Sequence, residues 1–377
     1  MDDIKVSVCM ITYNHERYIA QAVESVLAQQ TKCPFEIVIG EDCSTDKTRR
    51  ILLGLARRYP QTIRLRLADD NQGVNRNLAG TIGAARGRYV ALLEGDDYWA
   101  TTEKLQRQVE ALDSHADWAV CFHPASCTYE AGFQGDPIFP LDWTKQEATI
   151  DDLFENNFIP TCSVMFRNRL FAEFPAWYDG LKLGDWPLHL LNAEHGNIGY
   201  LPEVMATYRV HRGGVWSGAS QATRITAILE MLTAVDHHFH EKYATTIDRY
   251  RLGTMRYVLG ELDAVKTRVA GFMGDLRLQC SQESAPKSNI EANLHTLQRY
   301  TSSISSDFFK LETKYNKLRD RHRQLKSFHD QWSKSLAYRI TRETHRIIKK
   351  IERLWRRSSR TEIESQSRMD SPASKAA

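Results

Sequence analysis

The sequence predicts an α/β fold in which a mostly parallel sheet is flanked by helices. Short apolar runs of strand-forming residues alternate with amphipathic helical patterns in the first third of the chain. Several of these apolar runs end in acidic or polar residues. Right-handed crossovers place the carboxyl ends of parallel strands at one edge of a sheet, where ligands bind. We therefore expect a ligand site at that edge.

The alternation of strand and helix runs as far as His123. Each expected strand is a short apolar run, and each expected helix repeats apolar residues at a spacing of three and four. The expected strands are Val6–Thr12, Phe35–Gly40, Ile63–Leu67, Arg88–Glu94 and Trp118–His123. The expected helices are Tyr18–Leu27, Lys47–Tyr59, Asn75–Ala85 and Thr101–Ser114.

Beyond Ala125 the pattern weakens, because glycines and prolines mark loops as far as Ile150. Thr161–Phe166 is expected as an edge strand. Asp185 is a fair N-cap and Pro187 suits a first helical turn, so we expect a helix from there to Glu194. The remaining expected elements are the short strands Ile198–Leu201 and Val204–Val210, the loop His211–Ser217, and helices over 219–275.

Three carboxylates, Glu94, Asp96 and Asp97, follow the apolar run Tyr89–Leu93 directly. Clustered carboxylates repel one another and are costly to desolvate unless a cation lies among them. Oxygen ligands suit Mg²⁺ or Mn²⁺, which proteins commonly share with a substrate phosphate. The alternative is a solvated acidic turn that caps the next helix.

Composition limits the classes of protein that fit. The 377 residues, with 42% hydrophobic residues, suffice for one domain of about 200 to 250 residues and an appendage. A net charge of +3 argues against nucleic acid as a partner. Seven cysteines without a C-x-x-C pair indicate reduced thiols in a cytosolic protein. Because Asp2 and Asp3 are acidic and no apolar run is long enough to span a bilayer, we expect neither signal peptide nor membrane span.

Six motifs occur in an order and spacing that resemble the bacterial type of family 2 inverting glycosyltransferases, which have the GT-A fold. The resemblance covers roughly residues 4–217. It implies a Rossmann-like nucleotide-binding half, an acceptor half and a helical carboxyl-terminal extension. The motifs are Val8–Asn14, Gly40–Asp46, Asn71 with Gly73, Glu94–Asp97, Gly184–Trp186 and Tyr208–His211.

The resemblance implies a donor site that binds a nucleotide sugar, with a UDP-sugar favoured. Thr12, Tyr13 and Asn14 would line the base pocket, and Arg76 would lie near the nucleotide or diphosphate. Glu41 stands where the family usually has an aspartate that meets a uracil ring. This departure, one methylene longer, leaves the identity of the base open.

The resemblance also implies a metal site for Mn²⁺ or Mg²⁺ and a general base. Glu94 replaces the usual aspartate that begins the metal motif, Asp96 would meet the ribose or metal, and Asp97 the metal. His211 would face the metal or diphosphate, and Asp185 would be the catalytic base. The residues alone favour Asp185 as a helix cap and His211 as a loop histidine bonded to a carbonyl.

The chemistry of sugar transfer matches these side chains. A cation offsets the charge that grows on the leaving diphosphate, and a carboxylate takes the proton of the attacking hydroxyl. Inversion follows from a single displacement. The resemblance therefore implies a hexosyltransferase of surface polysaccharide or glycan synthesis that acts on a carbohydrate or lipid-linked acceptor. The alternatives are an inactive nucleotide-sugar-binding scaffold and a nucleotidyltransferase, although the early phosphate loop of the latter is missing.

The tail carries two further patterns. Apolar residues repeat in heptads over 294–332, which predicts a coiled coil and a homo-oligomer, although folding back onto the catalytic domain is an alternative. A basic amphipathic helix follows, which suits an anionic membrane surface or a protein partner. We expect a cytoplasmic protein, or a peripheral one on the cytoplasmic face of the inner membrane. The expected domains are 1–218 (GT-A), 219–278 (helical extension), 279–290 (linker), 291–357 (coiled coil and basic helix) and 358–377 (disordered).

Overall fold

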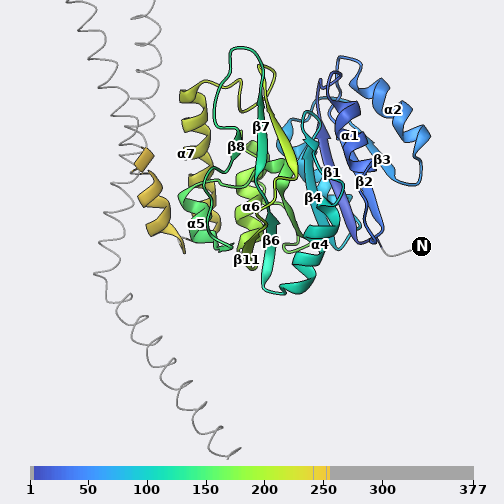
Figure 1. The fold of residues 1–377 in the computed structure, drawn as a ribbon. Helices are drawn as coiled ribbons and strands as arrows, with labels where there is room; N and C mark the ends of the chain where they lie inside the picture. Colours follow the sequence, from blue (N-terminus) through green and yellow to red (C-terminus); the bar gives the residue numbers. More distant parts are fainter. Residues whose placement is uncertain (1–3, 241, 252, 255–377) are drawn as a thin grey trace, which may run out of the picture. The chain divides into compact units, whose positions relative to one another are not determined.

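The computed structural model of the chain describes residues 4–240, 242–251, 253 and 254 (Figure 1). By its internal contacts the chain divides into two compact units, 1–274 and 275–377. The second unit lies outside the described residues, and so do the predicted linker, coiled coil, basic amphipathic helix and disordered tail. In the part of the chain that the structure describes, no helix is long and apolar enough to cross a membrane.

The larger sheet has eight strands in the order β3-β2-β1-β4-β10-β6-β11-β9. The parallel pairs β1–β2, β1–β4, β2–β3 and β6–β11 make it mostly parallel, as predicted. Strands β1, β3 and β4 lie where the apolar runs predict them. The strands are β1 (Val6–Thr12), β2 (Phe35–Glu41), β3 (Ile63–Leu67), β4 (Tyr89–Glu94), β6 (Trp118–Phe122), β9 (Glu147–Ala148), β10 (Met165–Arg167) and β11 (Asn197–Tyr200).

Strand β10 corrects one expectation. The predicted edge strand Thr161–Phe166 is instead a short 3-10 turn, Thr161–Ser163, followed by β10 in the middle of the sheet. There β10 pairs antiparallel with both β4 and β6. Because Met165 and Phe166 are buried on opposite faces of the sheet, the strand fits a central position despite its length.

A second, four-stranded sheet has the order β5-β12-β7-β8. Strand β5 (Tyr98–Trp99) directly follows the acidic turn, and it pairs with β12 (Ala206–Val210). Strand β12 also pairs in parallel with β7 (Ala125–Tyr129), which pairs with β8 (Ile138–Phe139). This sheet brings residues after 205 next to the acidic turn, which lies more than a hundred positions earlier in the sequence.

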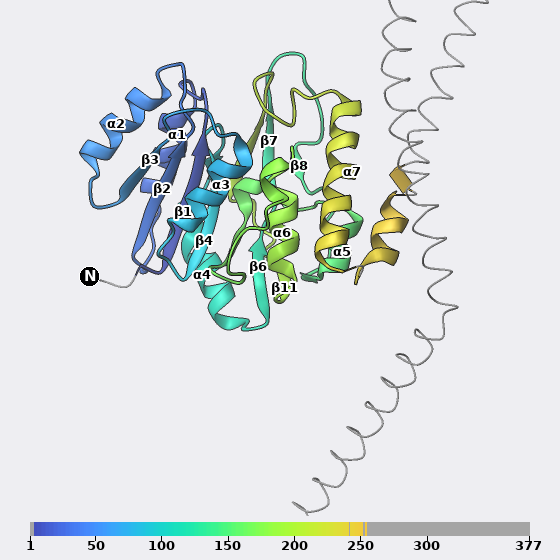
Figure 2. The same cartoon turned by 180° about the vertical axis from the view of Figure 1, so that it is seen from behind.

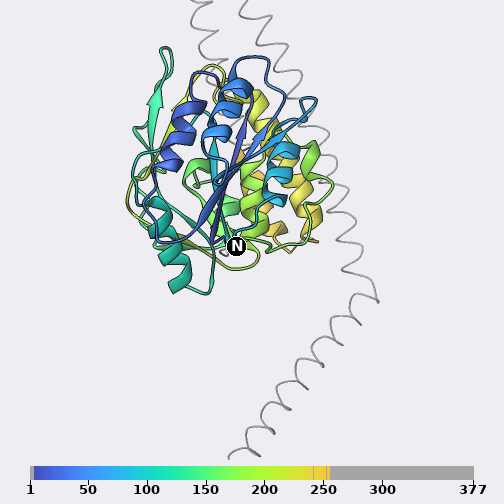
Figure 3. The same cartoon turned by 90° about the vertical axis from the view of Figure 1, so that its right-hand side faces the viewer.

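Helices cover both faces of the larger sheet. On one face α1 (Ile19–Leu27), α2 (Thr48–Arg58) and α4 (Lys104–Ser114) share a core with β1, β2 and β4. On the other face α3 (Val74–Gly83), α5 (Ile150–Glu155) and α6 (Asp185–Ala193) share a second core. The views from front and back show α1 and α3 on opposite sides (Figures 1 and 2), and the side view separates them again (Figure 3).

Helix α7 (Gln221–His238) belongs to the same core as α5 and α6. Met231, Leu232 and Val235 on its inner face are fully buried. The predicted helical extension therefore begins packed against the predicted GT-A domain, within one compact unit.

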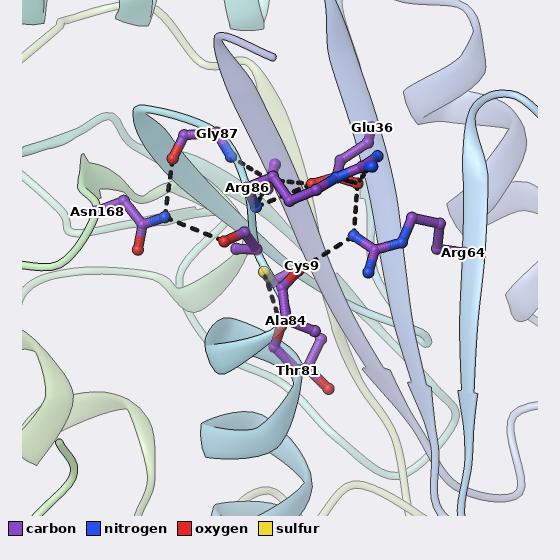
Figure 4. A network of polar contacts seen from close by, with 10 residues as sticks. Cys9, Glu36, Arg64, Thr81, Ala84, Arg86, Gly87 and Asn168 are labelled. Carbon is purple, nitrogen blue, oxygen red and sulfur yellow. Dashed lines mark hydrogen bonds and ion pairs between the residues drawn. The ribbon is translucent and has the colours of Figure 1, made fainter. Parts of the chain in front are cut away.

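A buried carboxylate fastens the end of the sheet at which β1, β2 and β4 begin (Figure 4). Glu36 in β2 is 1% exposed and accepts hydrogen bonds from the Ser7 hydroxyl at 2.7 Å, Arg64 at 2.8 Å and Arg86 at 2.7 Å. Burial raises the pKa of Glu36, but the bonds from Arg86, Arg64 and Ser7 outweigh it and lower the pKa to about 2. The network joins strands β1, β2 and β3 to the turn before β4.

Replacing Glu36 with Gln should lower the free energy of unfolding by about 2 to 3 kcal/mol at pH 7, because the guanidinium groups of Arg64 and Arg86 lose the negative charge that both of them contact. The folded pKa of about 2 lies below the ordinary value of 4.5. The stabilisation is therefore complete above pH 4.5 and is lost as the pH falls toward 2. Urea unfolding at pH 7 and pH 3 should show a smaller difference between the two proteins at pH 3. Equal stability at pH 7 would contradict the assignment.

Candidate active site

The acidic turn Glu94–Asp97 joins β4 to β5 at the carboxyl edge of the larger sheet. It packs directly on the end of β1, since the Gly95 amide donates to the Ile11 carbonyl at 2.9 Å. A Cβ atom on Gly95 would lie 2.6 Å from Thr12 Oγ1 and 2.9 Å from His15 Nδ1. Only glycine therefore fits between the acidic residues and the first loop.

Two histidines converge on Asp96. His211 Nε2 lies 3.0 Å from Asp96 Oδ2, and His15 Nε2 lies 3.6 Å from the same oxygen. The His211 ring also packs against Tyr18, with ring centroids 5.0 Å apart. Burial raises the pKa of Asp96, but the hydrogen bond from His211 and the charge of His15 hold it below its ordinary value. The structure thus brings together the candidate residues Asp96 and His211, and it adds His15, which the sequence did not single out.

Asp97 has a different environment. It is 1% exposed, and its Oδ1 accepts the backbone N–H of Arg209 at 2.8 Å. Among the described residues its Oδ2 has no hydrogen-bond partner. The Arg209 guanidinium donates to the Asp96 carbonyl and to Gln21, and it lies over the Tyr98 ring at 4.5 Å. Asp97 therefore anchors β12 to the acidic turn, and its role as a metal ligand stays a prediction.

The carboxylates of the turn cannot all carry charge without a nearby cation. Burial, with the charges of Asp96, Asp97 and Asp185, raises the pKa of Glu94 well above its ordinary value. Burial and the charge of Asp96 raise the pKa of Asp97 in the same way. A divalent cation would relieve both the repulsion and the desolvation cost.

The donor set of this turn suits a metal that is shared with a substrate. The described residues include no group of three or more His, Cys, Asp or Glu side chains that could hold a metal ion by itself. They do place Asp96 beside His211, with the half-buried Glu94 close by. Mg²⁺ is commonly bound by one or two carboxylates together with substrate phosphates and water. The residues therefore fit a divalent ion completed by a diphosphate.

The loops after β1 and β2 are fastened to each other. Asn14, with φ of 57°, accepts the Thr45 N–H on its side chain at 2.8 Å, and its own N–H donates to Ser44 Oγ at 2.9 Å. Thr12 is buried, whereas Tyr13 is 41% exposed. Of the three residues predicted to line the base pocket, Tyr13 and Asn14 are exposed and Thr12 is not.

Glu41 is wholly buried and already paired. Its Oε1 accepts the Ser44 N–H at 2.6 Å, and its Oε2 accepts Arg49 Nε. The donor contact expected of Glu41 stays a prediction, and it requires this pair to open. Neighbouring Asp42 accepts the Gln72 N–H at 2.8 Å and the Gly73 N–H at 2.9 Å, so it fixes the turn before α3.

Arg76, expected near the nucleotide or diphosphate, lies on α3 with its side chain 63% exposed. It pairs with Asp179 at 3.5 Å. An exposed guanidinium in such a pair is free to turn toward a phosphate, because an exposed ion pair contributes little stability.

Asp185 is the first residue of α6, and its side chain does not cap the helix. Its Oδ2 lies 3.2 Å from Asn157 Nδ2 and 3.4 Å from Thr161 Oγ1. Burial and neighbouring carboxylates are the main causes that raise the pKa of Glu94 and of Tyr208, and the charge of Asp185 adds to both shifts. Thr161, which contacts Asp185, directly precedes Cys162, whose carbonyl accepts Trp99 Nε1 at 3.0 Å just after the acidic turn.

Comparison with known proteins adds independent findings. Residues 7–172 match the family model described as glycosyl transferase family 2. The chain is 40% identical over 249 residues to the uncharacterized protein Rv1520 of Mycobacterium tuberculosis (strain H37Rv), covering 63% of this chain and 71% of that one. It is 31% identical over 225 residues to TuaG of Bacillus subtilis (strain 168), a glycosyltransferase named for teichuronic acid biosynthesis, covering 59% and 85%.

Similar solved structures share less sequence. Staphylococcus aureus TarS 1-349 in complex with UDP-GlcNAc is 23% identical with a TM-score of 0.47, over 60% of this chain and 66% of that one. The mannosyltransferase PcManGT of Pyrobaculum calidifontis, in complex with GDP-Man and Mn²⁺, is 18% identical with a TM-score of 0.47, over 62% and 64%. The longer TarS structure is covered over 39% of its length.

Replacing Gly95 with Ala should destabilise the protein by about 1 to 3 kcal/mol, because the added Cβ would overlap Thr12 and His15. Gly83→Ala is the matched control, since a Cβ there meets nothing within 4 Å. Urea unfolding of the two variants should separate them clearly. If Gly95→Ala unfolds at the same urea concentration as Gly83→Ala, the turn does not depend on this contact.

Proposed function

Because the chain belongs to glycosyl transferase family 2, we propose that it moves a sugar, with inversion, from a nucleoside-diphosphate sugar to a glycan or lipid-linked acceptor. The observation that supports the proposal is the contact of Asp185 with a segment that is hydrogen-bonded to β5, beside the acidic turn in which Asp96 contacts His211. A site of this kind offers a base on one side and a diphosphate-binding group on the other. We propose a UDP-sugar as donor.

The metal-binding side of the site is proposed to consist of Asp96, Asp97 and His211, with Glu94 and Asp96 near the nucleotide. A divalent ion bound there would neutralise the charge that develops on the leaving diphosphate. Burial and the neighbouring carboxylates raise the pKa of Glu94, and the same cation would favour its charged form. Thr12, Tyr13 and Asn14 would position the nucleotide, and Arg76 would meet the diphosphate after leaving Asp179.

The reaction itself is a single displacement. The acceptor hydroxyl oxygen forms a bond to the anomeric carbon as the bond from that carbon to the diphosphate breaks. The hydroxyl proton passes to Oδ1 of Asp185. The other oxygen of this carboxylate, Oδ2, already accepts hydrogen bonds from the side chains of Asn157 and Thr161. No protein nucleophile is required, and the configuration at the anomeric carbon inverts.

The similarity to TuaG supports a role in surface polysaccharide synthesis. We propose that the protein works in the cytoplasm or on the cytoplasmic face of the inner membrane, where lipid-linked acceptors are presented. The basic amphipathic helix and the coiled coil expected beyond residue 290 would supply membrane contact and self-association.

Replacing Asp96 with Asn should weaken Mn²⁺-dependent binding of UDP at least tenfold, because the charged partner of His211 is lost. Isothermal titration with UDP, in Mn²⁺ and in EDTA, measures the effect without turnover. Asp97→Asn should weaken the same binding if Asp97 is a ligand. Wild-type affinity in both variants would remove the metal assignment, and a loss of stability alone in Asp97→Asn would leave that residue only its anchoring role.

Replacing Asp185 with Asn should lower sugar transfer by about 10² to 10⁴ while donor binding persists, since the amide keeps the shape but cannot take the proton. The test follows release of nucleoside diphosphate from a panel of donors with Mn²⁺ and an acceptor. Near-normal transfer by the variant would refute Asp185 as base. Binding of a donor by the wild-type protein without turnover of any would favour the inactive scaffold instead.

A further inference from the structure

The segment between α5 and β10 contacts the proposed base directly. Asn157 Nδ2 and Thr161 Oγ1 both approach Oδ2 of Asp185, at 3.2 and 3.4 Å. Both side chains are partly buried, and both come from a segment with no regular helix or strand before the 3-10 turn at Thr161. Two donors on one oxygen fix the orientation of a carboxylate and leave its second oxygen for other partners.

The orientation of the Asn157 amide is itself determined by the backbone. Its Oδ1 accepts the N–H of Ile159 at 3.3 Å. Because an N–H must meet the oxygen of the amide, Nδ2 is the end that points to Asp185. The adjacent side chains Phe158 and Ile159 are 2% and 1% exposed, so they hold this part of the backbone in the core.

The other end of the segment is tied to the elements that carry the acidic turn. The Cys162 carbonyl accepts Trp99 Nε1 at 3.0 Å, and the Val164 carbonyl accepts the N–H of Leu92 at 3.1 Å. Leu92 lies in β4, just before the acidic turn, and Trp99 lies in β5, just after it. One short stretch of chain therefore contacts both the base and the two strands that flank the turn.

We propose that Asn157 and Thr161 are positioning residues that hold Oδ2 of Asp185 and present Oδ1 to the acceptor hydroxyl. The segment 157–164 then sets the position of the base relative to the diphosphate-binding turn. This inference rests on the proposed role of Asp185 as base. Loss of either donor lets the carboxylate rotate, and a misplaced catalytic group costs rate rather than donor affinity.

The test compares Asn157→Ala and Thr161→Val with two matched controls. Thr161→Ser keeps the hydroxyl and should restore transfer. Asn156→Ala removes the neighbouring amide, which is exposed, and should change nothing. We expect kcat for transfer to fall about tenfold or more in Asn157→Ala and in Thr161→Val. Affinity for UDP with Mn²⁺ and the melting temperature should stay near those of the wild-type protein.

A double-mutant cycle with Asp185→Asn separates positioning from a structural role. If Asn157 and Thr161 act through the base, their substitution should lower transfer no further once Asp185 is Asn. Additive losses in the double variants, or unchanged kcat in both single variants, would overturn the inference. Near-normal transfer by Asp185→Asn alone would instead overturn the proposed base, which is a different outcome of the same set of proteins.

Discussion

Carboxylates crowd the end of β4, a strand whose apolar residues are all buried, and the surrounding structure holds them there. Asp97 accepts the backbone N–H of Arg209, which draws β12 and hence His211 to the turn. Gly95 allows the turn to lie against the first loop. Burial, together with repulsion among these groups, raises the pKa of Glu94 and Asp97. A cation would offset both effects, and the contacts that fix these carboxylates are already present in the protein without a ligand.

Much of the larger sheet could be predicted because long apolar runs carry their own signal. Strands β1, β3 and β4 are five to seven residues long and lie at the predicted positions. Strand β10 is only three residues long, and so short a run has no period by which to place it. The second sheet was foreseen only in β12, since β5 and β8 have two residues each. Its pairing depends on contacts distant in sequence.

The residues of the candidate site also differ in how far the sequence predicts them. Asp96, His211 and Asp185 could be named as candidates because their chemistry and motif context are visible in the sequence, and the structure brings Asp96 and His211 into contact. The partners of charged groups were not visible. Glu41 is neutralised by Arg49, and Asp97 is bonded to a backbone N–H 112 positions away. Asn157 and Thr161 lie in a stretch without periodicity, where an asparagine or a threonine is ordinary loop composition. Such partnerships are set by tertiary contact alone.

The insertion of β10 between β4 and β6 has a consequence for synthesis of the chain. Strand β4 can pair with β1 as soon as it emerges, but its other edge waits for Met165–Arg167. At about 5 to 20 residues per second, the roughly 70 intervening residues take about 4 to 14 seconds to be made. During that interval an apolar strand presents unpaired backbone groups, the feature that makes nascent chains prone to aggregate. The growing polypeptide therefore has a defined window in which a chaperone would protect it, and the window closes when the segment that also holds the proposed base folds into place.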